Sequence, residues 1–479
     1  MMPSLRVVAI LRRMTRDSAG EAPVTLAAVP AGRGALITES RIAAAEILAS
    51  LRGGTLLDAA FERVTTTLDP RDRRWVQELV YGLLRSRGWI DAILAPRITG
   101  GLARLDADLG DLLRLGAYQL LSMGSVPAYA AIAQTVELAK RRHGIGASKL
   151  VNAVLRRIDR ERDLPNVATP DGTAAALDRN HDLTERLAVR TSHPRWLLER
   201  WIAQWGKEAT ERLTAHNNSE APIIVRPFGI TRDELHESLQ ERGVDTIPAP
   251  LITDGLQLPP GVALTQLGAF QRGQLYVQDS GSALVVQYAN IPRGDVAADL
   301  CAAPGGKTLA LVQAGATVIA SDRSANRLQR LHANLERMHA THVDVREMDA
   351  TAPTLEPVDA ILVDVPCTGT GTFRRHPDAR WRLRVSDIAL LPVLQRDILA
   401  AASSCVKPGG LLIYSTCSLE REENDAVVNE FLADDDSFVL EPPPAGTVPD
   451  AVIDAGFLRV LPQVHGVDGA FAARLRRIR

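Results

Sequence analysis

Two cysteines follow short apolar runs of the chain and have the side chain needed for nucleophilic chemistry. Cys367 ends the segment DVPC, and Cys417 lies inside the segment YSTCS. A thiolate can add to an electron-poor carbon and leave again, which divides one difficult step into two easier ones. A buried cysteine is more often an inert apolar side chain, and Cys301 and Cys405 fit that simpler interpretation.

A glycine-rich turn, DLCAAPGGKT, follows an earlier apolar run. Gly305 and Gly306 leave room for a ligand to approach the backbone, and the helix expected after them offers free N–H groups. Cys301 stands where a phosphate-binding loop has a glycine, and the GxGxxG dinucleotide fingerprint is also missing from the sequence. The turn therefore indicates a ligand site without naming the ligand.

Acidic residues follow the next two apolar runs. Asp322 comes sixteen residues after Gly306, where a carboxylate can accept hydrogen bonds from both ribose hydroxyls. Asp349 could bind the adenine amino group. Each aspartate taken alone is a helix N-cap more often than a ligand. Together with the glycine-rich turn they predict an adenosine pocket, and the missing phosphate loop favours S-adenosylmethionine over a nucleoside phosphate.

The thiols and the adenosine pocket fit one reaction, methylation of carbon 5 of cytosine. That carbon becomes nucleophilic when a thiolate adds to carbon 6, and it can then take a methyl group. Asp364 is placed to bind the N3/N4 edge of the base and to stabilise the charge that develops on the ring. A base then removes the proton from carbon 5, and the thiol leaves by elimination.

These residues need a sheet that brings their strand ends together. After Ile291, short apolar runs alternate with helical segments, a pattern that predicts a parallel sheet covered on both faces. Ligands bind at the carboxyl ends of the strands in such sheets. The expected strands are Val296–Leu300, Thr317–Ser321, Val343–Met348, Ala360–Val363 and Leu411–Tyr414.

The 479 residues are too many for one core, and the chain before Ile291 divides into further parts. Helical periodicity is clear in stripes such as Ile42, Ala45, Ile47 and Leu48. We expect a multidomain chain with a disordered extension over residues 1–35, an all-helical domain over 36–165, a polar linker over 166–182, a small α+β subdomain over 183–290, and a Rossmann-like methyltransferase domain over 291–479.

The helical region carries an excess of basic residues. The net charge is only -2, but residues 36–160 carry 18 Lys and Arg against 13 Asp and Glu. This excess is either a solvated helix surface or a phosphate-contacting surface, and the sequence leaves both open. The basic residues that lie closest together are Lys140, Arg141, Arg142, Lys149, Arg156 and Arg157.

Other features suggest where the protein works. No apolar run approaches the roughly 20 residues of a membrane span, and the first residues resemble a signal peptide poorly. None of the four cysteines forms a CxxC pair, which argues against a structural zinc site and a disulfide scaffold. We therefore expect a protein of the reducing cytoplasm without a bound metal.

Several segments resemble motifs of the RNA cytosine-C5 methyltransferases, and the likeness runs from about Ser40 to the end of the chain. The segments are YVQDSGSALV, DLCAAPGGKT, DVPCTGTGTFRRHPDARW, YSTCS and DGAFAARL. In the helical part, RDRRWVQELVYGLLR and KLVNAVLRR are similar to the NusB-like RNA-binding domain. This pairing resembles the bacterial 16S rRNA branch of the family, which implies 16S rRNA as the partner, naked or in an assembling small subunit.

The resemblance also implies roles for individual residues. Cys417 would be the nucleophile, Cys367 would assist release of the methylated product, and Asp364 would act on the base. DNA cytosine methyltransferases use the cysteine of the Pro–Cys pair instead, so the second cysteine favours the RNA class. The residues expected to bind S-adenosylmethionine are Cys301, Ala302, Ala303, Pro304, Gly305, Gly306, Lys307, Asp322, Asp349 and Asp364.

Two alternatives compete with this interpretation. An N-methyltransferase would carry an Asp/Asn–Pro–Pro–aromatic turn, whereas this chain has DVPC at that place. A non-catalytic ribosome-assembly or transcription factor would use the NusB-like domain and would have no need for Cys417.

Overall fold

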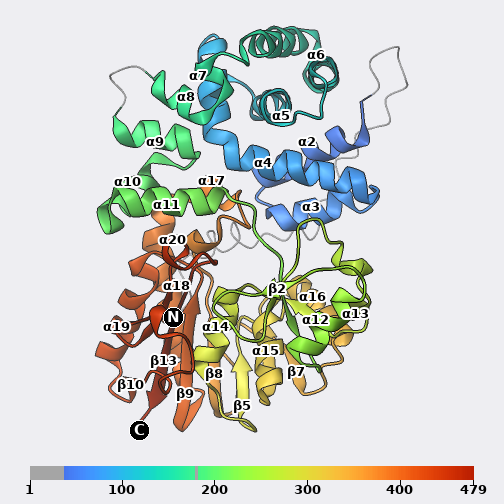
Figure 1. Ribbon diagram of the computed structural model, residues 1–479. Helices are drawn as coiled ribbons and strands as arrows, with labels where there is room; N and C mark the ends of the chain where they lie inside the picture. The colour runs from blue at the N-terminus through green and yellow to red at the C-terminus, as the bar shows by residue number, and fades with distance from the viewer. Residues whose placement is uncertain (1–36, 178–181) are drawn as a thin grey trace. The chain divides into compact units, whose positions relative to one another are not determined.

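The computed structural model describes residues 37–177 and 182–479, and the extension expected over residues 1–35 lies outside them. Contacts divide the described chain into two units (Figure 1). The helical unit comprises the described residues up to Asn218 together with His376–Arg382. The sheet unit comprises Ser219–Arg375 and Leu383–Arg479.

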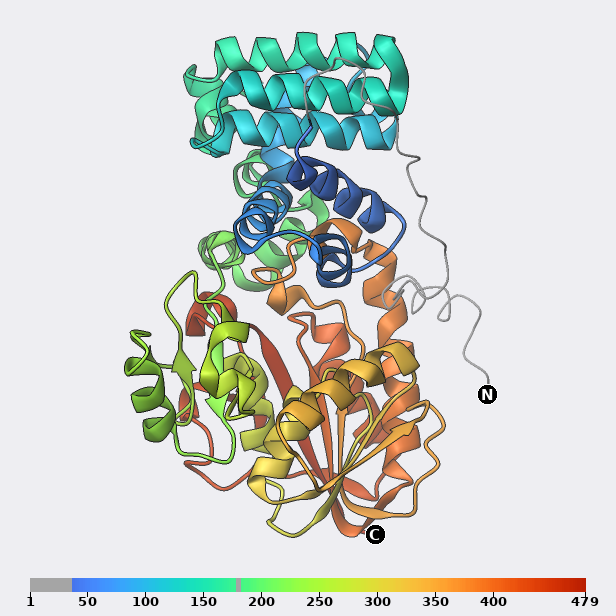
Figure 2. The ribbon, with the colours of Figure 1, turned by 90° about the vertical axis from the view of Figure 1, so that its right-hand side faces the viewer.

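Amphipathic helices with well-defined starts build the helical unit. At the start of α4, Asp69 accepts hydrogen bonds from the N–H groups of Arg71 and Asp72, and Pro70 takes the first helical position. Helix α5 lies beside α6 (Figure 2), and Gly144 interrupts α6 with a φ of 84°. Apolar side chains from α2 to α6 form one core. The bounds are α2 (Glu39–Arg52), α3 (Leu57–Thr65), α4 (Pro70–Leu94), α5 (Ala107–Ser122) and α6 (Ala128–Glu161).

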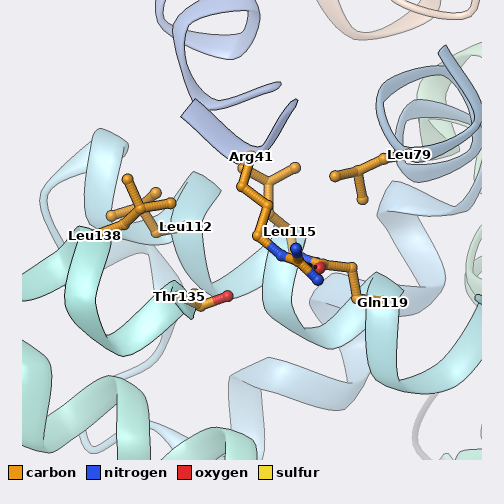
Figure 3. A pocket seen from close by; sticks show the side chains of 7 residues that line it. All are labelled: Arg41, Leu79, Leu112, Leu115, Gln119, Thr135 and Leu138. Atoms are coloured by element: carbon orange, nitrogen blue, oxygen red, sulfur yellow. Dashed lines mark hydrogen bonds between the residues drawn. The ribbon is translucent and has the colours of Figure 1, made fainter. Parts of the chain in front are cut away.

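A narrow crevice between α2, α4, α5 and α6 is filled by a buried arginine (Figure 3). Arg41 Nε donates a hydrogen bond to Gln119 Oε1 at 2.7 Å, and its guanidinium lies 4.9 Å from the centre of the Trp75 ring. Burial lowers the pKa of Arg41. The remaining space does not admit a water molecule, so the crevice belongs to the packing of the core. Its lining residues are Arg41, Leu79, Leu112, Leu115, Gln119, Thr135 and Leu138.

Helices continue where the sequence predicts an irregular linker. Pro165 and Pro170 begin the short helices α7 and α8, because proline at a first helical position lacks only an N–H that has no partner there. Three further helices, which the sequence analysis assigned to the α+β subdomain, belong by their contacts to the helical unit. The bounds are α7 (Pro165–Ala168), α8 (Pro170–Ala175), α9 (Leu183–Thr191), α10 (Arg195–Trp205) and α11 (Lys207–Asn218).

A short segment from the second half of the sequence also belongs to the helical unit. It contains α17 (Ala379–Arg382). Trp381 Nε1 donates to Leu84 O at 2.7 Å, and Arg380 Nη1 donates to Asn218 Oδ1 at 2.7 Å. Arg380 is fully buried, and burial lowers its pKa to about 9. Two large side chains therefore anchor this segment among the helices.

A small antiparallel sheet begins the sheet unit, with the strand order β2-β3-β1-β4. Val225 and Leu256 pack with Leu235 of α12 in its core. Helix α12 begins with a capping box made by Thr231 and Glu234. The bounds are β1 (Ile224–Pro227), α12 (Arg232–Gln240), β2 (Ile247–Pro248), β3 (Leu256–Gln257), α13 (Gly268–Gln271) and β4 (Leu275–Val277).

All five strands expected from the sequence are confirmed, and they form the parallel part of a larger sheet ordered β7-β6-β5-β8-β9. Figure 1 shows β5, β8 and β9 side by side. The chain reverses its direction of progress at β5, which has β6 on one side and β8 on the other, and ligands bind at such switch points. The bounds are β5 (Val296–Asp299), β6 (Thr317–Asp322), β7 (Val343–Glu347), β8 (Val358–Asp364) and β9 (Val406–Thr416).

Antiparallel strands that the sequence analysis did not predict extend this sheet beyond β9. Strand β13 pairs with β9, with Phe471 opposite Thr416, and it also pairs with β12 and β10. These strands are β10 (Phe438–Leu440), β11 (Ile453–Asp454), β12 (Phe457–Val460) and β13 (Ala470–Arg477). Besides α12 and α13, the unit contains α14 (Ser280–Ala289), α15 (Gly306–Ala314), α16 (Ala325–Arg337), α18 (Val385–Ser403), α19 (Asp425–Asp434) and α20 (Pro462–His465).

Candidate active site

The glycine-rich turn joins β5 to α15, and side chains of α16 hold its shape. Gly305 has a φ of 109°, a conformation that favours glycine, and a Cβ there would lie 2.7 Å from Leu331 Cδ1. Arg327 Nη2 donates a hydrogen bond to Ala303 O at 2.6 Å. Burial raises the pKa of Cys301 in the same turn, so this thiol stays protonated.

Asp299 ends β5 directly before the turn and is 1% exposed. Thr308 Oγ1 donates to Asp299 Oδ2 at 2.8 Å, which connects the strand to the first turn of α15. Burial raises the pKa of Asp299 to about 7. The sequence alone does not indicate a role for Asp299, because its only signal is its position at the start of the DLCAAPGGKT segment.

Asp322 ends β6 as predicted and has the features of a ligand-binding carboxylate. The Ser324 N–H donates to Asp322 Oδ1 at 3.0 Å. The other oxygen, Oδ2, lies 3.2 Å from Arg327 Nη1, yet it is buried and accepts no hydrogen bond of good geometry. A buried carboxylate oxygen whose hydrogen-bonding capacity is not filled is uncommon, and it fits a ligand that brings hydroxyl donors, such as a ribose. The residues present therefore fit the adenosine part of S-adenosylmethionine.

Asp349 follows β7, as the sequence predicts, and its carboxylate contacts the turn after that strand. Strand β7 ends at Glu347, before Asp349 is reached. The carboxylate of Asp349 is exposed, and its Oδ1 accepts hydrogen bonds from Thr351 N at 2.9 Å and Thr351 Oγ1 at 2.8 Å. Asp349 thus stabilises the turn after β7, and its contact with an adenine stays a prediction.

Lys307 and Asp364 form an ion pair between the first turn of α15 and the end of β8. Lys307 Nζ lies 2.7 Å from Asp364 Oδ2, and Ser415 Oγ donates to Asp364 Oδ1 at 2.8 Å. Burial lowers the pKa of Lys307, but the charge of Asp364 and its hydrogen bond outweigh burial and raise the pKa. The Asp364 side chain is 33% exposed, which leaves its carboxylate open to a ligand. The sequence alone does not indicate this contact of Ser415, which follows only from its position opposite Asp364 in the strand register.

The parallel pairing of β8 with β9 brings the two predicted cysteines together. Because Asp364 lies opposite Ser415, the turns that follow these strands begin at the same edge of the sheet. The Sγ atoms of Cys367 and Cys417 are 3.4 Å apart. The hydrogen bond with Cys417, and then burial, raise the pKa of Cys367 well above its ordinary value. Cys367 therefore keeps its proton at neutral pH.

Three family models match successive parts of the chain. The model described as NusB family matches residues 38–160, and a ferredoxin-like domain of the RsmF/B-like methyltransferases matches residues 193–265. The model described as 16S rRNA methyltransferase RsmB/F matches residues 287–476. A helical domain, a small α+β subdomain and a Rossmann-like domain therefore follow one another as the sequence predicts.

Comparison with whole proteins decides the family. The probable ribosomal RNA small subunit methyltransferase B of Synechocystis sp. is 35% identical over 89% of this chain and 96% of its own length. The ribosomal RNA small subunit methyltransferase B of Pseudomonas syringae pv. tomato is 34% identical over 91% of this chain and 97% of its own length. The chain belongs to this methyltransferase family. The crystal structure of a protein called PH0851 shares the fold with a TM-score of 0.77, at 25% identity over 93% of this chain and all of that one.

Family membership establishes the general activity and the cofactor. The chain is an rRNA methyltransferase that uses S-adenosylmethionine. The resemblance to RNA methyltransferases that the sequence motifs indicated is confirmed at this level. The roles of individual residues in this methyltransferase are proposals, taken up below.

The basic cluster of this methyltransferase is partly neutralised within the helical unit. Arg142 Nη1 lies 3.0 Å from Asp108 Oδ1, Arg141 Nε lies 3.0 Å from Glu137 Oε1, and Arg157 Nε lies 2.8 Å from Glu161 Oε1. Lys140, Lys149 and Arg156 are exposed. The six residues therefore carry less net charge than their number indicates, and their contact with RNA stays a prediction.

Residues 37–177 and 182–479 of this methyltransferase lack two features of other classes of protein. In these ranges, no helix is long and apolar enough to cross a membrane. Nor do the same residues contain a group of three or more His, Cys, Asp or Glu side chains arranged to hold a metal ion.

Proposed function

We propose that the protein methylates carbon 5 of a cytosine in 16S rRNA through a covalent bond between Cys417 and carbon 6 of the base. The observation that carries this proposal is the 3.4 Å contact between the thiols of Cys367 and Cys417. This contact lies just after the ends of β8 and β9. Asp364, which pairs with Lys307, is the last residue of β8. S-adenosylmethionine supplies an electrophilic methyl group, which the activated carbon 5 accepts.

Cys417 is the proposed nucleophile. Its thiolate forms a bond with carbon 6, and the electrons of the 5,6 double bond move toward carbon 5. The Cys367 S–H lies within hydrogen-bonding distance of the Cys417 sulfur. The positive charge of Lys307 interacts with the charge of Cys417, and this interaction contributes to the raised pKa of Lys307. One neighbouring donor and one neighbouring cation thus support the charged sulfur.

Asp364 acts on the other edge of the base. Its partly exposed carboxylate accepts a hydrogen bond from the exocyclic N4 amine and stabilises a proton at N3 while negative charge moves into the ring. Lys307 and Ser415 hold the two carboxylate oxygens at 2.7 and 2.8 Å, so the group is already oriented before the substrate binds. Such preorganisation avoids a reorganisation cost during the reaction.

Cys367 assists release by changing its protonation state. Once Cys417 is bonded to carbon 6, its sulfur no longer accepts the Cys367 proton, and the main cause of the raised Cys367 pKa is removed. Cys367 then loses its proton to solvent and takes the proton from methylated carbon 5. The electrons of that C–H bond restore the double bond, the sulfur–carbon 6 bond breaks, and Cys417 leaves as a thiolate. Both thiols return to their starting states.

The compartment follows from the same chemistry. None of the four cysteines, all of which lie in the described residues, forms a disulfide. Reduced thiols and an rRNA substrate both fit the bacterial cytoplasm. We propose that the protein works there on 16S rRNA, naked or in an assembling small subunit.

Trapping the adduct tests this proposal. Wild type, Cys367→Ala and Cys417→Ala are incubated with S-adenosylmethionine and unmethylated small-subunit rRNA, and denaturing gels show protein that stays bound to RNA. Cys367→Ala should accumulate the adduct because release is slow, and Cys417→Ala should form none. Cys405→Ala, a change at a buried thiol in the turn before β9, is the matched control and should behave like wild type. An adduct with Cys417→Ala would exclude Cys417 as the nucleophile.

A further inference from the structure

We propose that Glu423 is a positioning residue that ties the turn carrying Cys367 to the turn carrying Cys417 and so keeps the two thiols in contact. The inference rests on the proposed function for its catalytic consequence. The thiols lie on separate turns, after β8 and after β9. Their 3.4 Å separation therefore needs an explanation in the contacts between those turns.

One carboxylate contacts the residue that follows each cysteine. On the side of Cys367, the Thr368 N–H donates to Glu423 Oε1 at 2.9 Å, and Thr368 Oγ1 donates to Glu423 Oε2. On the side of Cys417, Ser418 Oγ donates to the same Oε2. The Thr368 and Ser418 hydroxyls also lie 3.0 Å apart. Glu423 Oε2 is therefore the point at which the two turns meet.

The neighbouring asparagine completes the hold on the Cys417 turn. Thr416 Oγ1 donates to Asn424 Oδ1 at 2.6 Å, and Asn424 Nδ2 donates to Ser418 O at 2.9 Å. Asn424 thus binds the residues on both sides of Cys417, while Glu423 reaches across to the other turn. Nothing in the sequence alone shows that Glu423 contacts Thr368.

The body of the sheet unit fixes Glu423 itself. Gln395 Nε2, from α18, donates to Glu423 Oε1 at 2.9 Å and to Pro366 O at 2.9 Å. Tyr414 Oη donates to Glu423 O at 2.6 Å. Gln395 and Tyr414 are fully buried, as is Glu423. A buried glutamate lowers the stability of the fold unless it is hydrogen-bonded. The hydrogen bonds of Glu423 run to residues next to a cysteine, Thr368 and Ser418, or to Gln395 and Tyr414.

Replacement of Glu423 by glutamine makes its contribution testable. Burial raises its pKa to about 7, although the hydrogen bonds from Ser418 and Thr368 oppose the shift. Glutamine has the same shape but places an NH₂ group where one acceptor oxygen stood. Either the hydroxyls of Thr368 and Ser418 or the backbone N–H of Thr368 then loses its acceptor. The loss of hydrogen bonds to a charged group corresponds to a change of about tenfold to a hundredfold in an equilibrium or a rate.

A thiol-proximity assay tests the geometry without RNA. Diamide accepts the two thiol hydrogens when a pair of cysteines forms a disulfide, and peptide mapping identifies the Cys367–Cys417 pair. We expect Glu423→Gln to form this disulfide at least about tenfold more slowly than wild type. Glu356→Gln, the same change at an exposed glutamate between β7 and β8, should match wild type. Equal rates for all three proteins would overturn the inference.

Adduct kinetics test the catalytic consequence. Under single-turnover conditions, Glu423→Gln should release methylated RNA about tenfold to a hundredfold more slowly, with an unchanged KM for S-adenosylmethionine. Release at the wild-type rate would overturn the inference. If Cys417→Ala still formed the adduct, the proposed function would be wrong, and so would the catalytic part of the inference. The diamide assay would still test whether Glu423 keeps the two thiols in contact.

A second pair of variants separates positioning from a general loss of structure. Thr368→Val and Ser418→Ala each remove one hydroxyl that donates to Glu423 Oε2. Because both act through one oxygen, the double variant should slow release by less than the product of the two single effects. The inference would be overturned if the double variant slowed release by the full product of the two single effects, or if the single variants released product at the wild-type rate. This test holds even if Glu423→Gln proves unstable.

Discussion

Replacing Asp299 by asparagine should make stability less dependent on pH. Burial raises the pKa of Asp299 from 3.8 to about 7, so the folded state binds this proton more tightly than the unfolded chain does. The protonated carboxyl therefore contributes stability that is complete below the unfolded pKa of 3.8 and is lost as the pH rises through about 7. At about 1.4 kcal/mol per pKa unit, the loss between pH 5 and pH 8 is about 2 to 3 kcal/mol.

Urea unfolding at pH 5, 6.5 and 8, followed by circular dichroism, measures this effect. The free energy of unfolding of Asp299→Asn relative to wild type should rise by about 2 to 3 kcal/mol from pH 5 to pH 8. Asp245→Asn, at an exposed position of the same unit, is the matched control and should show no such trend. If the free energy of unfolding of Asp299→Asn changed with pH as that of wild type does, the raised pKa of Asp299 in the folded state would be refuted.

Three further substitutions test other parts of the account. Asp364→Asn should lower kcat by about a hundredfold to a thousandfold in methyl-transfer assays at saturating substrates, and a normal kcat would exclude Asp364 from the chemistry. Trp381→Phe removes the donor to Leu84 O and should destabilise the helical unit by about 1 kcal/mol; an unchanged urea midpoint of tryptophan fluorescence would contradict this. Lys149→Glu should weaken RNA binding most at low salt, and a salt-independent affinity would remove the proposed RNA contact.

The parallel strands could be predicted because they are buried on both faces and are therefore continuous apolar runs. The antiparallel strands β10, β11 and β12 could not, because they are only two to four residues long and resemble loops. The assignment of α9, α10 and α11 to the helical unit depends on tertiary contacts that leave no local signal. The same is true of Trp381, whose binding site is formed by residues about three hundred positions earlier in the chain.

The candidate site shows the same division between local and non-local information. Cys367, Cys417 and Asp364 could be identified because each follows an apolar run, and parallel strands bring such positions to one edge. Glu423 and Ser415 could not, because their roles depend on which hydroxyls and carboxylates they meet after folding. Asp349 keeps two interpretations, because its local sequence suits both an adenine ligand and the turn that it stabilises.

The most direct test of the central claim is the identity of the methylated nucleoside. S-adenosylmethionine labelled in its methyl group is incubated with unmethylated small-subunit rRNA and either wild type or Cys417→Ala, and the RNA is then digested to nucleosides. We expect the label in 5-methylcytidine with wild type and no label with Cys417→Ala. Label in a different nucleoside, or equal transfer by Cys417→Ala, would contradict the account.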